Sequence, residues 1–175
     1  MSENTRIRRT PAEILAAKEA DLVNAKARAA VDAQMSHPTV VNLTGLITSH
    51  SKARTEAKKG YNGNPNQTFA NRIQSHTLWN EEIKAEKEVA DAQIALSDAL
   101  SPMYRDLRIK VATALANGEN VSEMVTSESA TIEADAMSLY AEVNDAKAFL
   151  AIQTANRKAF LESKKAGKAE QVATA

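Results

Sequence analysis

Several residue types that shape folds or carry chemistry are scarce in this chain. Among its 175 residues there is no cysteine, aromatic side chains make up 4%, and there are five glycines and four prolines. The missing cysteine excludes disulfides and thiolate metal sites, and it fits a reducing compartment. No stretch approaches the ~20 apolar residues of a membrane-spanning helix, and the polar start has no signal-peptide core. We therefore expect a cytoplasmic protein that does not enter a membrane.

Alanine dominates what is present. It accounts for 33 residues of a hydrophobic fraction of 43%. Alanine has the best helix propensity but buries little surface per residue. Such a chain forms helices readily around a thin core, so long helices and self-association are the expected outcomes.

The few prolines and glycines fall mostly at boundaries of helical patterns. Thr10-Pro11-Ala12-Glu13 is a capping box, His37-Pro38 and Ser101-Pro102 read as further helix starts, and Gly60 and Asn117-Gly118 read as helix ends. We predict an all-α fold of about five long amphipathic helices in an elongated bundle or coiled-coil-like arrangement. The segments expected from this punctuation are a flexible basic arm (1–9), an N-terminal helical hairpin (10–60), a loop (61–66), a bundle region (67–165) and a disordered tail (166–175).

Two apolar patterns suggest contacts between helices. The helix expected from about 67 to 100 has apolar stripes on opposite sides, so it should touch something on both. From residue 132 onward, apolar residues alternate at spacings of four and three, which is the pattern of a coiled-coil seam. An ordinary bundle helix and an intermolecular coiled coil both explain this seam, and we expect an oligomer whose contacts include one of the two patterns. The candidate self-association residues are Ile132, Ala136, Leu139, Val143, Ala146, Leu150 and Phe160.

Charge is balanced overall, with 22 basic and 22 acidic residues, but it is grouped in blocks. Residues 119–146 contain seven acids and no lysine or arginine, whereas basic residues cluster in 1–9, 52–59 and 147–168. Solvated helix faces explain these blocks, and so would contacts between basic and acidic segments within or between chains. Arg6, Arg8 and Arg9 are candidates for contact with nucleic acid or with an acidic partner, although three arginines give few phosphate contacts.

The pattern of polar residues does not point to catalysis. His37, His50 and His76 are far apart and lack the spacing of a metal-binding motif, and no nucleophile has a base and an orienting group nearby. We therefore expect no enzyme activity, no catalytic, metal-binding or cofactor-binding residues, no cofactor and no small-molecule substrate.

The opening residues Arg8-Arg9-Thr10-Pro11-Ala12-Glu13-Ile14-Leu15-Ala16, with Lys26-Ala27-Arg28-Ala29-Ala30 after them, resemble the start of uncharacterised small helical proteins of bacteria and bacteriophages. The resemblance implies a phage-encoded assembly or virion-associated component, and it carries over no site residue.

Three functional hypotheses remain open. The leading one is a non-enzymatic structural or interaction protein that self-associates. The second is a small nucleic-acid-associated protein that uses the N-terminal arginines. The third is an adaptor or inhibitor that presents an acidic helix face to a basic protein.

Overall fold

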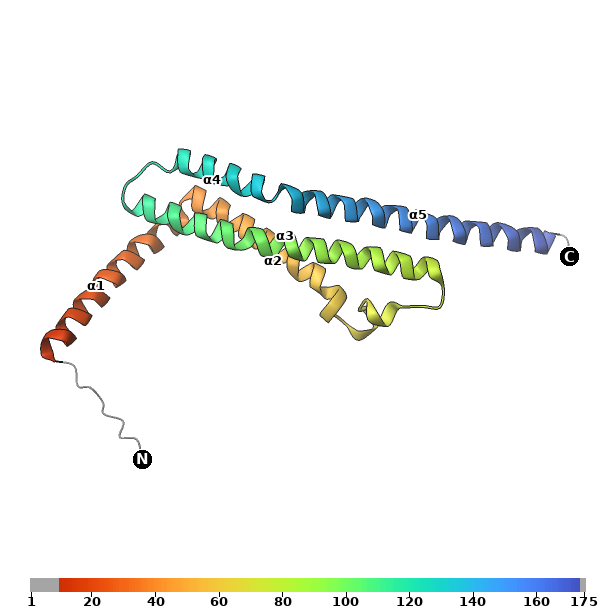
Figure 1. The fold of residues 1–175 in the computed structure, drawn as a ribbon, viewed down its shortest axis with the longest axis horizontal. Helices are drawn as coiled ribbons and strands as arrows, with labels where there is room; N and C mark the ends of the chain where they lie inside the picture. The colour runs from red at the N-terminus through yellow and green to blue at the C-terminus, as the bar shows by residue number, and fades with distance from the viewer. Residues whose placement is uncertain (1–9, 174–175) are drawn as a thin grey trace, which may run out of the picture.

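A computed structural model describes residues 10–173 and shows five α-helices (Figure 1). The predicted all-α fold is confirmed, because no strand occurs in this range. The α-helices are α1 (Pro11–Ala33), α2 (Pro38–Asn62), α3 (Thr77–Ala116), α4 (Ser122–Asp135) and α5 (Met137–Ala173), and the short 3-10 turns are Gln34–Ser36, Pro65–Gln67 and Ala70–Arg72. None of the helices within the described range is long and apolar enough to cross a membrane.

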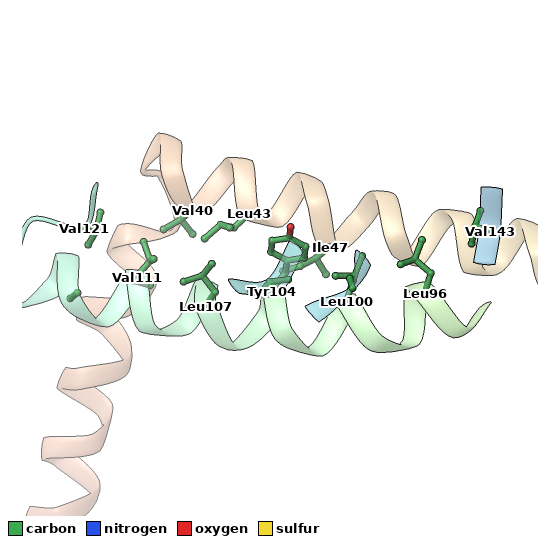
Figure 2. Close-up of a cluster of buried hydrophobic side chains, with 14 residues drawn as sticks. Val40, Leu43, Ile47, Leu96, Leu100, Tyr104, Leu107, Val111, Val121 and Val143 are labelled. Carbon is green, nitrogen blue, oxygen red and sulfur yellow. The ribbon is translucent and has the colours of Figure 1, made fainter. Parts of the chain in front are cut away.

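The centre of the molecule is α3, which is 40 residues long and packs against α2 and α5 (Figure 1). The predicted contacts on two sides of this helix are thereby confirmed. Figure 2 shows how Val40, Leu43 and Ile47 of α2 lie over Val111, Leu107 and Tyr104 of α3. Side chains of α4 and α5, including Ile132 and Val143, belong to the same cluster. One thin core therefore runs along α3 and joins four helices.

Pro102 lies inside α3, where we had expected one helix to end and another to begin. An interior proline removes one helical hydrogen bond and costs about 3 kcal/mol. However, Leu100 and Tyr104 on either side of it are almost completely buried. Because each fully buried large side chain contributes roughly 1.5–3 kcal/mol, packing on both sides of the proline outweighs its cost and keeps the helix continuous.

The expected helix start near Gln67 is also wrong, because α3 begins at Thr77. Between α2 and α3 the chain forms two short turns with extended backbone at Thr68 and Ile73. The side chain of Asn80 accepts a hydrogen bond from the Gln74 amide at 2.8 Å and donates one to the Gln74 carbonyl. His76 then caps α3, since its Nδ1 accepts from the Leu78 amide at 3.3 Å. These local hydrogen bonds hold the segment before Thr77 outside the helix, so α3 begins ten residues later than the apolar periodicity predicted.

Gly60 does not end a helix; it lies within α2, which continues to Asn62. Its role is steric. The ring of Phe69 lies against it, so a Cβ atom at this position would overlap the ring. The Phe69 amide donates to the Gly60 carbonyl at 2.8 Å, and Tyr61 packs edge to face on Phe69 at 5.2 Å between ring centroids. Phe69 therefore anchors the connecting segment on α2 instead of continuing the stripe of α3.

The other expected segments differ in detail. α4 runs unbroken past Ser127 and ends at Asp135, and Ala136 separates it from α5. α5 stays helical to Ala173, although we had expected a disordered tail from residue 166. α1 projects away from the other helices and does not fold back as the expected hairpin with α2 (Figure 1).

We predict that Gly60→Ala lowers the free energy of unfolding by about 1–3 kcal/mol, because the added methyl displaces the Phe69 ring. Gly45→Ala is the matched control, since Gly45 lies in the same helix with nothing within 4 Å of the new Cβ. That substitution should stabilise the protein by up to ~1 kcal/mol through helix propensity. Urea denaturation measures both. Equal effects of the two substitutions would contradict the steric role of Gly60.

Candidate interaction surface

The seam residues lie on the face of α4 and α5 that packs against the bundle. Ile132, Ala136 and Val143 are buried, and Leu139, Ala146, Leu150 and Phe160 are half-buried. The sequence therefore identified the correct face. Its partner in the structure is α3 of the same chain, which is the arrangement of an ordinary bundle helix. The second apolar pattern, on α3, is likewise covered by α2 and α5.

The polar positions near the end of the seam meet a carboxylate of α3. Glu82 is only 8% exposed, and its carboxylate forms an ion pair with the Arg157 guanidinium and accepts a hydrogen bond from the Thr154 hydroxyl at 3.0 Å. A buried carboxylate that meets its charged partner in only one alignment of the two helices favours that alignment. These residues therefore set the register of α5 on α3 within the chain.

An aromatic cluster extends this contact at the same end of the rod. The rings of His76 and Trp79 on α3 meet Phe160 of α5, with centroids 4.7 Å apart for His76–Phe160 and 6.2 Å apart for Trp79–Phe160. Arg157 also lies over the indole of Trp79, at 5.7 Å from the centroid. Cation–π and edge-to-face contacts of this kind add to the burial of the rings. The end of the seam is therefore covered by the rings of His76 and Trp79 and is not a free surface.

Among the described helices, α1 has the most exposed large apolar side chains. None of its residues, all of which the structure describes, is buried. Ile14, Leu15, Leu22 and Val23 are 44%, 59%, 56% and 66% exposed. Only its last turn reaches the core, where Val31 packs against the buried cluster. A projecting helix with four exposed large aliphatic side chains is the best candidate for an interaction surface.

The start of α1 is well defined by its own side chains. The Glu13 carboxylate accepts from the Thr10 amide at 2.7 Å, while the Thr10 hydroxyl accepts from the Glu13 amide at 3.3 Å. The hydrogen bond from the Thr10 amide holds the pKa of Glu13 below its usual range. The predicted capping box is therefore present. The sequence already contained the signal for this surface, because the apolar residues of α1 are too sparse for a core helix.

The charged residues of the blocks that the structure describes pair mostly with residues outside the opposite block. Arg6, Arg8 and Arg9 lie outside the described residues. Arg54 and Lys59 of the 52–59 block pair with Asp98 and Glu56, and Arg157 pairs with Glu82. Among the side chains of residues 10–167, no ion pair joins one of the basic blocks to the acidic stretch.

The acidic stretch itself is partly engaged by α3. Glu128 pairs with Lys110 at 2.8 Å, and Glu133 accepts a hydrogen bond from the Tyr104 hydroxyl. Glu119, Glu123, Asp135, Glu142 and Asp145 are exposed. This outer surface of α4 and α5 stays available to a basic partner.

The histidines serve local structure, a role that the sequence analysis did not assign to them. His37 caps α2, with its Nδ1 accepting from the Thr39 amide at 3.3 Å, and His76 caps α3. His50 stacks on Tyr104, with centroids 5.9 Å apart and an interplanar angle of 10°. In the part of the chain that the structure describes, no group of histidine, aspartate and glutamate side chains could hold a metal ion.

Two open hollows, of about 640 and 590 Å³, flank Phe69 between α2 and α3. Tyr61, Lys87 and Asp91 form the polar cluster beside them, with the Tyr61 hydroxyl and Lys87 both bonded to Asp91. Burial raises the pKa of Tyr61, and the hydrogen bond to Asp91 raises the pKa of Lys87. Both groups therefore stay protonated near neutral pH, so neither supplies a general base.

Comparison with protein-family models, curated proteins and solved structures finds no match to this chain.

We predict that Arg157→Met lowers the free energy of unfolding by about 2 kcal/mol, because buried Glu82 loses its charged partner. The control is Lys158→Met, which removes a neighbouring exposed charge on the same helix. Urea denaturation measures the stability. The fluorescence of Trp79, the sole tryptophan, also reports on its contact with Arg157 and Phe160. If the two variants lose equal stability, the proposed register contact is wrong.

His50 should make stability depend on pH. Burial lowers the pKa of His50 in the folded protein, and Glu133 opposes this effect only in part. Below the unfolded-state pKa of about 6.5, the unfolded chain binds the proton more readily, so stability falls as pH falls. We predict a shallower loss of stability between pH 7 and pH 5.5 for His50→Phe than for the wild type. Parallel pH slopes in urea denaturation would refute this origin.

Proposed function

We propose that this protein is a non-enzymatic helical structural or interaction protein that self-associates through α1. The observation that carries the proposal is the exposure of Ile14, Leu15, Leu22 and Val23 on a helix that projects from the bundle (Figure 1). Helices α2 to α5 share one buried core, and the large apolar side chains that stay exposed on them, such as Val41, Ile109 and Met137, are fewer on each helix than on α1. The contact of α1 with the core is confined to its last turn.

The energetics favour a partner for this helix. An isolated amphipathic helix is marginal in water, because most helical stability in proteins comes from packing of the apolar face. The 23 residues of α1 extend about 35 Å, at ~1.5 Å per residue, with little packing of their own. Covering them in an assembly would stabilise the helix and remove the aliphatic side chains from water at once.

The most specific form of the proposal is a phage-encoded assembly or virion-associated component that acts in the cytoplasm of an infected cell. It is supported by the resemblance of the opening residues, and self-association through a projecting helix suits such a role.

We predict that Leu15→Glu combined with Leu22→Glu abolishes assembly and leaves the bundle folded, because neither side chain belongs to the core. The wild type should have a mass above that of one chain in light scattering at tens of micromolar, and the variant should have the mass of one chain. Circular dichroism and thermal melting check that α2 to α5 are unchanged.

The matched control is Ala20→Glu combined with Ala27→Glu, which adds the same charge to the opposite face of the same helix. It should assemble as the wild type does. A monomeric wild type, or equal behaviour of the two double variants, would overturn the proposal. Repeating the wild-type measurement with double-stranded DNA at two salt concentrations tests the nucleic-acid hypothesis, which requires complexes that dissociate as salt rises.

A further inference from the structure

The apolar residues of α1 are distributed unevenly along its length. All four exposed large aliphatic side chains lie between residues 14 and 23. From residue 24 to residue 30 the apolar residues are alanines, at positions 25, 27, 29 and 30. One half of the uncovered surface is therefore bulky and the other half is nearly flat.

This distribution distinguishes the two ways of pairing two copies. The distance between packed helices depends on the side chains at their contact. Parallel copies would place large against large and alanine against alanine, so the bulky half would hold the flat half apart. Antiparallel copies place Leu15 of each helix on Ala29 of the other, with Leu22 on Leu22 at the centre, which gives a more even spacing along the contact.

The charges beside the contact line favour a second copy of the same helix as the partner. Leu22 is the midpoint of α1, and Leu15 and Ala29 lie seven residues before and after it on the same line. Glu19 and Lys26 flank this line on one edge, and Asp21 and Arg28 flank it on the other. In an antiparallel pair centred on Leu22, Glu19 lies level with residue 25 of the other copy and so beside its Lys26, whereas Asp21 lies near Asp21 of the other copy. Parallel copies would instead pair Asp21 with Lys26, so the flanking charges favour a second copy of this helix, and the sizes of the side chains decide the direction.

The shape of the molecule is compatible with this pairing. The bundle lies at one end of α1, and the other end projects away from it (Figure 1). Antiparallel pairing places the two bundles at opposite ends of the helix pair. Parallel pairing would bring both bundles to the same end, where they would compete for space.

We propose that α1 binds α1 of a second copy in antiparallel orientation, centred near Leu22, with Leu15 facing Ala29. The inference rests on the proposed self-association through α1 and adds the partner and its direction. Lys18 lies beside the contact line on the Ala25 side, and its charge reduces the stability of the pair while its stem covers apolar surface.

Disulfide trapping tests the direction, because the chain has no cysteine of its own. Full-length Leu15→Cys and Ala29→Cys proteins are oxidised separately and as an equimolar mixture. A disulfide needs Cα atoms less than about 7 Å apart, so antiparallel pairing should link the two variants to each other at least ~10 times faster than either links to itself. Ala20→Cys mixed with Ala27→Cys, on the opposite face, should show no such preference.

The outcomes separate this inference from the function on which it rests. If Leu15→Cys or Ala29→Cys links mainly to itself, the pairing is parallel and the antiparallel arrangement is wrong, while self-association through α1 stands. If no α1 variant links and the double glutamate variant still assembles, the contact lies elsewhere and both proposals fail. If the wild type assembles, the double glutamate variant does not, and the mixture fails to link, the proposed register is overturned.

Discussion

Burial of α3 on two faces is the constraint on which the rest of this structure depends. Alanine-rich helices supply few large side chains, and α3 concentrates those of the core into one long element. Leu96, Leu100, Tyr104, Leu107 and Val111 recur at helical spacing and meet α2 and α5 from two sides. The result is an open rod around a central helix (Figure 1). A thin core of this kind is long enough to align helices but cannot also cover α1.

Polar contacts give this thin core its alignment. Apolar packing between alanine-rich helices distinguishes poorly between neighbouring registers, because many positions are alike in size. The Glu82–Arg157 pair, the Tyr104 hydroxyl bonded to Glu133 and the Lys110–Glu128 pair each join α3 to α4 or α5 at a different height. Because Glu82 is buried, loss of its partner is costly, so this contact penalises sliding of α5 along α3, while the two more exposed contacts to α4 add smaller penalties.

The molecule thus consists of a rod, in which α2 to α5 share one core, and of α1, which contributes little to that core. The rod buries or half-buries the seam from Ile132 to Phe160. α1 has a strong local start, a fixed attachment at Val31 and an uncovered aliphatic surface between them. Because its side chains contribute little to the core, substitutions there separate assembly from folding, which makes the proposed function open to direct tests.

The sequence by itself determined that the chain is helical, where α1 and α2 begin and which face of α4 and α5 is buried. The capping box at Thr10, the start at Pro38 and the turn at Gly118, whose φ is 78°, depend on neighbouring residues and were read correctly. The seam spacing also predicted which side of α4 and α5 would be buried. These features depend on interactions within one or two helical turns, so they survive in any tertiary arrangement.

Only the tertiary structure decided what covers each face. The same seam spacing fits a partner helix in another chain or in the same chain, and in the structure the partner is α3 of the same chain. Pro102 stays inside a helix because distant side chains pack on both of its sides, and Gly60 is required by Phe69 rather than by a helix end. A local pattern shows that a stripe must be buried, but the partner depends on connections and volumes summed over the whole chain. These connections and volumes also leave most of α1 exposed.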